Sequence, residues 1–360
     1  MKSTKEKQAI DVILPCRNSR IIGHQMPLQE LEYICKSDKI PQSWLFTGPK
    51  GVGKATCAYR FARYLLAGGA SDLIENPEKL YVSSSSPTFL RVAGDSHSDL
   101  LVITADSESA SGDIKIDEIR KINDFLRMTA SETKNRIVII DSADDLNSNA
   151  ANALLKLLEE PPFGAIFILI SHAPGKLLPT IKSRCRQLRL MNLSKDEAAR
   201  VMDFVMPGLS PKESEQLVAL SCGSPGVAVW LYNNDAIKLY KSLVDIINSL
   251  PNLNYSLLQS FSNKITGKDD KDAWGIFLYL LNFLIVGVLR LEARGEPVVE
   301  IVGSESEIKF KLKVEKTLAQ GLKVWEKINS LILQTSHLNL DKKAVLISIF
   351  EELKNLGSAG

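Results

Sequence analysis

The chain has 360 residues, of which 45% are hydrophobic and 24% are charged, and its formal net charge is +2. This length suffices for two or three domains, and this composition excludes a chain that is disordered throughout. So small a net charge does not by itself indicate a nucleic-acid partner or an anionic membrane.

Cysteines and apolar runs indicate the compartment. The five cysteines lie far apart and form no C-x-x-C pair: Cys16, Cys35, Cys57, Cys185 and Cys222. This predicts reduced thiols in the cytoplasm, with neither a disulfide framework nor a zinc site. The longest apolar run, 273–289, is shorter than the roughly 20 residues that span a bilayer and contains Asn282. We therefore expect a cytoplasmic protein with no membrane partner, in which this run is a buried helix.

The first half of the chain alternates strand and helix signals. Strand signals occur at 43–47, 136–140, 165–170 and 187–190, and helix signals at 54–66 and 148–160. The second of these helices stops at Pro161-Pro162. Strands that alternate with helices predict an α/β fold, a parallel sheet with helices on both faces. The stretch 68–98, rich in Ser, Gly and Pro, reads as a surface excursion.

After Met191 the strand signal disappears. Residues 192–232 read as a small helical unit that begins with a capping box, Ser194 and Glu197. From Ala236 the pattern is helical to the end, with breaks at Pro251 and at 295–297. We therefore expect three domains: an α/β P-loop domain at 1–190, a small helical lid at 191–234 and a helical domain at 235–360.

A phosphate-binding loop is predicted between the first strand and the first helix. Gly48-Pro49-Lys50-Gly51-Val52-Gly53-Lys54 has the glycine spacing of a P-loop, in which backbone N–H groups surround phosphates and the lysine reaches the outer ones. The Ser or Thr that normally follows the lysine and binds magnesium is Ala55 here. Thr56 is one residue further on, rotated by about 100° around the helix, and is a doubtful substitute.

The second half of the predicted site is also incomplete. Asp141, which ends the strand at 136–140, fits the Walker B aspartate that helps to hold magnesium. The residue that follows is Ser142, which cannot act as a general base. Asp144 and Asp145 read as a solvated turn or a helix cap. We therefore expect nucleotide binding without efficient hydrolysis, and the sequence leaves open whether magnesium is held.

Further motifs resemble the bacterial clamp-loader subunits, an AAA+ family. The run 151–162, Ala-Asn-Ala-Leu-Leu-Lys-Leu-Leu-Glu-Glu-Pro-Pro, resembles the helix after Walker B in that family, and Ser183-Arg184-Cys185 resembles its Ser-Arg-Cys motif. Ile22-Gly23-His24 and 223–226, Gly-Ser-Pro-Gly, match its opening segment and second-domain sensor region. The resemblance covers about residues 20–230. Within the family the chain is most similar to the subunits that lack the hydroxyl and the glutamate, whereas motor subunits of the gamma/tau type carry both.

The resemblance implies an AAA+ domain, a lid domain and a C-terminal collar domain in a ring that loads the sliding clamp on primed DNA. Its implied partners are gamma/tau-type and delta subunits, with the clamp and the DNA reached through the assembly. By carry-over Arg184 would be an arginine finger acting in trans, and the nucleotide, ATP or ADP, would lie against Gly48, Gly51, Gly53, Lys54, Ala55, Thr56, Asp141 and Ser171. Relatives with a zinc module have four cysteines before Walker B; none lies in 68–98, so no zinc is expected.

Several alternatives stay open. The basic residues Lys182, Arg184, Arg186 and Arg189 could form a solvated edge, and Ser171 could be a strand-end cap instead of a phosphate sensor. Val227 stands where active relatives often have a sensor arginine, and the three histidines 24, 97 and 172 read as ordinary polar residues. The chain could instead be a self-sufficient ATPase of the gamma/tau type that uses Thr56 and Asp144 as stand-ins, or a nucleotide-gated adaptor outside replication.

Overall fold

The computed structural model describes residues 12–37, 39–68, 79–105, 112–128, 134–267, 272–312, 318–338 and 340–358. Their contacts divide the chain into two compact units. The first is formed by Met1–Leu209 and Gly223–Val227, and the second by Ser210–Cys222 and Ala228–Gly360.

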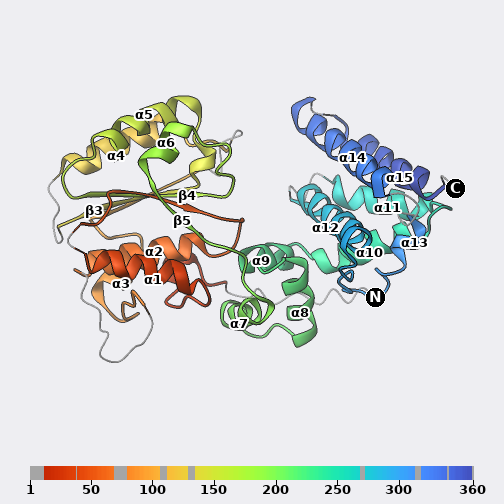
Figure 1. The fold of residues 1–360 in the computed structure, drawn as a ribbon, viewed down its shortest axis with the longest axis horizontal. Helices are drawn as coiled ribbons and strands as arrows, with labels where there is room; N and C mark the ends of the chain where they lie inside the picture. Colours follow the sequence, from red (N-terminus) through yellow and green to blue (C-terminus); the bar gives the residue numbers. More distant parts are fainter. Residues whose placement is uncertain are drawn as a thin grey trace. The chain divides into compact units, whose positions relative to one another are not determined.

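The first unit is an α/β domain (Figure 1). Its elements in chain order are η1 (Pro15–Arg17), α1 (Gln25–Cys35), β1 (Ser43–Thr47), α2 (Lys54–Leu66), α3 (Pro87–Ala93), β2 (Leu100–Thr104), α4 (Ile116–Arg127), β3 (Arg136–Asp141), η2 (Ala143–Asp145), α5 (Ser148–Glu159), β4 (Ala165–Ser171), α6 (Pro179–Arg184), β5 (Arg186–Arg189) and α7 (Lys195–Val205). The five described strands pair in parallel in the order β2-β3-β4-β1-β5, which confirms the predicted parallel sheet.

Helices cover both faces of this sheet, with α1, α2 and α3 on one face and α4, α5 and α6 on the other (Figure 1). Alternate side chains of each strand enter two separate apolar clusters. Phe46 packs with α1, α2 and α3, whereas its neighbour Leu45 packs with α4, α5 and α6. Because both faces are covered, β1 and β4 are buried at every position, which explains why the residues inside these two strands are all apolar.

The stretch 68–98 differs from the expected surface excursion in its second half. Residues 69–78 lie outside the described residues. Beyond them Leu80 and Val82 are buried, and the serine-rich run contributes the N-cap of α3, where the Ser86 hydroxyl accepts a hydrogen bond from Phe89 N at 3.1 Å. The expectation was wrong here because a helix of seven residues shows too little periodicity, and its capping serine resembles a loop residue.

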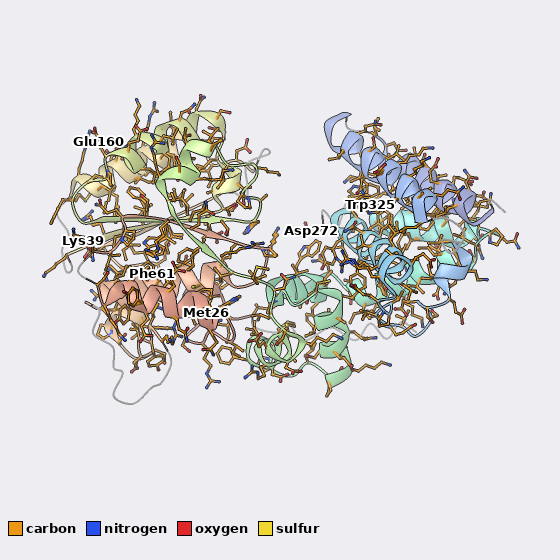
Figure 2. All side chains as sticks on the ribbon, in the orientation of Figure 1. Met26, Lys39, Phe61, Glu160, Asp272 and Trp325 are labelled. Carbon is orange, nitrogen blue, oxygen red and sulfur yellow. The ribbon has the colours of Figure 1, made fainter. Side chains whose placement is uncertain are left out.

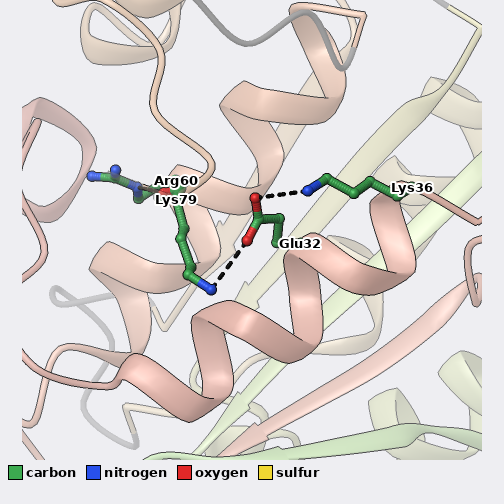
Figure 3. Close-up of polar contacts among 4 residues, drawn as sticks. All are labelled: Glu32, Lys36, Arg60 and Lys79. Atoms are coloured by element: carbon green, nitrogen blue, oxygen red, sulfur yellow. Dashed lines mark hydrogen bonds and ion pairs between the residues drawn. The ribbon is translucent and has the colours of Figure 1, made fainter. Parts of the chain in front are cut away.

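Polar contacts fix the chain after Lys79 to the first helices, as Figure 3 shows. Glu32 on α1 forms ion pairs with Lys36 at 3.0 Å and with Lys79 at 3.1 Å. Arg60, which is buried on α2, donates from Nε to the Lys79 carbonyl oxygen at 2.8 Å. The two lysines lower the pKa of Glu32, against the effect of burial, with Lys36 contributing most. These contacts keep α1, α2 and the segment at Lys79 in one layer.

The second unit is helical. It contains α8 (Pro211–Leu220), the part of α9 (Pro225–Asn233) from Ala228 on, α10 (Ala236–Asn248), α11 (Tyr255–Ile265), α12 (Ala273–Arg294), α13 (Ile308–Lys311), α14 (Leu318–Leu338) and α15 (Lys342–Ser358). Helix α12 packs against α10, α11 and α14. Phe277 on α12 lies 5.7 Å from Phe261 on α11 and 6.5 Å from Phe350 on α15, measured between ring centroids. The division into three domains stays a prediction.

Helix α12 contains the longest apolar run of the sequence. By length and composition it could cross a membrane, and 44% of its most apolar window is buried inside the structure. Core helices of soluble proteins pass the same test, so this helix is weak evidence for a membrane span. Among its buried residues are Trp274, Phe277 and Leu281, which face neighbouring helices as the sequence predicts.

Candidate nucleotide site and the arginine at the opposite edge

Three predicted site residues meet at the carboxyl edge of the sheet. In the parallel register Ser171, which ends β4, lies opposite Thr47, which ends β1 and leads into the P-loop. Asp141, which ends β3, lies opposite Ile170 of β4. Ligands of open α/β sheets bind outside the carboxyl ends of the strands. The strand order therefore gathers the P-loop, Asp141 and Ser171 at the edge where a nucleotide is expected.

The P-loop has the backbone conformation that its glycines allow. Gly48, Gly51 and Gly53 have positive φ angles of 144°, 78° and 102°, a region that residues with a Cβ rarely adopt. The Lys54 side chain is buried, and its ammonium donates to the carbonyl oxygens of Gly48 at 2.7 Å and Pro49 at 2.6 Å. Burial lowers the pKa of Lys54 to about 8, although Asp141 and Asp144 act against this shift.

Two segments that are distant in sequence contact the backbone of the P-loop. The Gly226 N–H donates to the Gly51 carbonyl oxygen at 2.8 Å, and these two glycines approach so closely that a Cβ on Gly226 would lie 2.8 Å from Gly51 Cα. His24, in the left-handed conformation at the start of α1, lies with Nε2 2.8 Å from the Val52 carbonyl oxygen. Burial lowers the pKa of His24. The P-loop conformation therefore depends on residues distant in sequence.

Asp144 is a structural clamp and not a solvated turn residue. Its carboxylate accepts hydrogen bonds from the Ser171 hydroxyl at 2.7 Å, the Ser142 hydroxyl at 3.1 Å, and the backbone N–H groups of His172 and Ala173. Burial alone would raise its pKa, but these donors, led by Ser171, lower it overall. Asp144 thus joins the turn after β3 to the end of β4. The Ser171 hydroxyl, expected to face phosphate or to cap the strand, donates to this clamp.

The residues at the carboxyl edge fit a phosphate chain better than a magnesium ion. Backbone N–H groups of the P-loop and the Lys54 ammonium suit phosphate oxygens. Asp141 supplies one carboxylate, and burial raises its pKa, an effect that the Lys54 charge opposes. Position 55 has a methyl group in place of a hydroxyl, Thr56 is half-buried in the first turn of α2, and the Asp144 oxygens already accept four hydrogen bonds.

In the described part of the chain, no group of three or more His, Cys, Asp or Glu side chains is arranged so that it could hold a metal ion. The absence of zinc stays a prediction.

Arg184 lies at the other edge of the sheet. It ends α6, two residues before Arg186, which pairs with Trp44 near the start of β1. Since β5 and β1 run in parallel, Arg184 is at the amino edge, separated from the P-loop by a strand of about 13 Å. The guanidinium is one-third exposed, donates from Nη1 to the Thr180 carbonyl oxygen at 3.0 Å, and pairs through Nη2 with Glu159 at 2.6 Å.

The alternative of a solvated basic edge also included Arg186. Its guanidinium pairs with Glu30 at 2.9 Å and lies over the Trp44 ring, so solvent is not its only contact. Three further residues make contacts at these edges that the sequence did not predict: His24, Asp144 as a clamp, and Glu159. His24 and Glu159 had a sequence signal, because both lie in segments that match family motifs.

A P-loop after β1, an aspartate ending β3 and a parallel sheet with helices on both faces form an α/β P-loop fold of the AAA+ class. Residues 23–194 match the model of a family described as "DNA polymerase III, delta subunit". This part of the chain, just under half of its length, is thus similar to that family.

Individual relatives show the same similarity. DNA polymerase III subunit delta' of Pseudomonas aeruginosa is 32% identical over 58% of this chain and 61% of its own length. Subunit delta' of Bacillus subtilis is 31% identical over 58% of this chain and 61% of its own length. Subunit tau of Bacillus subtilis is 30% identical over 54% of this chain and 32% of its own length. The chain thus spans about three fifths of the delta' relatives and one third of the tau relative.

Proposed function

We propose that this chain is a delta-prime-like subunit of the DNA polymerase III clamp loader, a stator that turns over little or no ATP itself. In this proposal Arg184 reaches the nucleotide of a neighbouring ATPase subunit while the assembly loads the sliding clamp on primed DNA. The partners are gamma/tau-type and delta subunits, and the location is the cytoplasm. The names of the relatives support the assembly, and the geometry of Arg184 supports the role.

The observation that carries the proposal is the separation of Arg184 from its own P-loop. A guanidinium at the amino edge cannot contact phosphates at the carboxyl edge of the same sheet. It is partly exposed and ends a helix at the surface. An arginine in such a position can reach a nucleotide only on another subunit. A guanidinium keeps its charge at all accessible pH values and stabilises the charge that develops during phosphoryl transfer.

The state of the chain's own site supports weak or absent hydrolysis. Ala55 offers no hydroxyl to magnesium, Ser142 offers no carboxylate to a water molecule, and Asp144 is engaged as a clamp. The P-loop and Lys54 still suit the phosphates of ATP or ADP. We therefore assign this site to nucleotide binding, with magnesium held at most through Asp141.

The arginine role is tested in a reconstituted loader containing gamma-type and delta subunits, this chain, clamp and primed DNA. We expect Arg184→Ala to lower clamp-dependent ATP turnover by about tenfold or more, because loss of an arginine finger removes charge stabilisation in the transition state. Arg120→Ala is the matched control, since Arg120 is also an exposed arginine paired with a carboxylate, Asp117 at 2.7 Å. Equal turnover of the Arg184 variant and the wild type would contradict the proposal.

The self-sufficient ATPase is tested with the purified chain alone. We expect no ATP turnover above background in the presence of magnesium. Turnover that disappears in Lys54→Ala would instead establish a motor subunit. Co-purification with gamma-type and delta subunits checks the assembly itself, and its absence would favour an adaptor outside replication.

A further inference from the structure

Glu159 is placed to hold the side chain of Arg184. The carboxylate ends α5 and lies 2.6 Å from Arg184 Nη2, while the Thr180 carbonyl oxygen accepts from Nη1 at 3.0 Å. The guanidinium is thus held by two acceptors, one from its own helix and one from the helix before β4. Of its five N–H donors these contacts occupy two, which leaves three for another ligand.

The packing of the helices brings this pair together. Ile181 of α6 is fully buried in the cluster that also contains Leu154 and Leu158 of α5. The C-terminus of α5 and the C-terminus of α6 are therefore fixed relative to each other by their apolar faces. Glu160, the next residue after α5, is exposed at the surface (Figure 2).

The contact matters little for folding. Both partners are partly exposed, 33% for the Arg184 side chain and 48% for that of Glu159, and ion pairs of this kind contribute little to stability. The arginine side chain has many rotamers, however, and binding must order them. Because the Glu159 carboxylate already fixes the guanidinium as a second acceptor, less side-chain entropy is lost on binding.

We propose that Glu159 is a positioning residue that orients Arg184 toward the nucleotide of the neighbouring subunit. This inference rests on the proposed function. The opposite role is also conceivable, in which the Glu159 carboxylate competes with the phosphates for the guanidinium and keeps Arg184 inactive. Because three donors remain free, the guanidinium can engage phosphate oxygens without leaving Glu159, and the geometry favours positioning.

The experiment measures ATP turnover of the reconstituted loader with clamp and primed DNA. We expect Glu159→Ala to lower kcat roughly two- to tenfold, the equivalent of freeing one ordered side chain, with KM for ATP unchanged. Glu159→Gln keeps an acceptor oxygen at the same reach and is expected to retain most of the turnover. Glu160→Ala, at the neighbouring carboxylate, is the matched control and is expected to behave as the wild type.

A double variant separates this inference from the proposed function. If Glu159 acts through Arg184, Glu159→Ala has no further effect when Arg184 is already alanine. Higher turnover of Glu159→Ala, unchanged turnover, or a loss that adds to that of Arg184→Ala would each overturn the positioning role. If Arg184→Ala itself has no effect, the arginine-finger role is contradicted, and with it the positioning role of Glu159. Thermal unfolding of each variant confirms that the fold is unchanged.

Discussion

His172 follows Ser171 at the carboxyl edge of the sheet. The Nδ1 atom of its imidazole is buried and has no hydrogen-bond partner in the described structure. Burial, the Lys54 and Lys50 charges and, in the opposite direction, Asp144 together lower its pKa to about 4. A neutral imidazole is thus part of the folded state at neutral pH.

This imidazole predicts a loss of stability in acid. In the unfolded chain His172 takes up its proton near pH 6.5, but in the folded chain only near pH 4, so the unfolded state binds more protons between these values. We expect the free energy of unfolding to fall as the pH decreases from about 6.5 to about 4. Chemical denaturation across this range should show a smaller decrease for His172→Asn. Identical pH profiles of variant and wild type would show that His172 does not titrate in this way.

At the scale of elements, the P-loop and the start of α9 are in close backbone contact at Gly51 and Gly226. This contact leaves little space for a side chain at either position. Gly226 does not have a positive φ, so only space restricts it. Its N–H donates to the Gly51 carbonyl oxygen, and an added Cβ would lie 2.8 Å from Gly51 Cα and 3.1 Å from Gly51 O. Backbone atoms cannot move aside as the end of a long side chain can.

Gly226→Ala is therefore expected to lower the free energy of unfolding by about 1–3 kcal/mol, the usual cost of forcing an extra carbon into a packed site. Gly175→Ala is the matched control, because a Cβ on Gly175 meets no atom within 4 Å and its φ is not positive. Urea denaturation of both variants checks the difference. If Gly226→Ala unfolded like the control, the P-loop and α9 would have to separate in solution.

The sequence pattern was sufficient for most strands of the sheet and for two of its helices. The strands β1, β3, β4 and β5 and the helices α2 and α5 lie within one or two residues of their predicted bounds. The strand β2 and helix α4 were not predicted. In α4 only Ile119 and Ile122 are buried, so the apolar signal is confined to one narrow stripe. The short helix α3 was also not predicted, because it lies in a stretch whose composition resembles a loop.

The candidate site was predictable where a motif fixes the chemistry. The spacing of Gly48 to Lys54 and the strand ending at Asp141 place those residues correctly at the carboxyl edge. Contacts between distant segments were not predictable, because no local pattern encodes them. Asp144 accepts from residues 27 to 29 positions away, and Gly226 contacts Gly51 across 175 positions, the difference of their numbers.

At the scale of the whole molecule, the second unit exposes apolar residues on two adjacent helices. Leu322 and Leu333 on α14 are 42% and 62% exposed and lie eleven residues apart, which places them on one face of the helix. Ile347 on the adjacent α15 is 46% exposed. We propose that this surface joins the collar of the assembly.

Leu333→Asp is expected to weaken binding to gamma-type and delta subunits by about tenfold or more, because a charge would be buried in an apolar contact. Pull-down with purified subunits measures this effect. Leu90→Asp is the control, since Leu90 is an exposed leucine, 58%, on α3 of the first unit. Undiminished binding by the Leu333 variant would exclude this surface from the collar.

The placement of Arg184 and the P-loop on opposite edges of one sheet has a consequence for symmetry. Subunits that joined arginine to P-loop would meet through two unlike surfaces, and such contacts run head to tail. Repeated from subunit to subunit, such contacts generate a row or a ring. Under the proposed function, this chain stands at the end of such a row, where Arg184 faces the nucleotide of a neighbouring subunit and the chain's own P-loop receives no arginine.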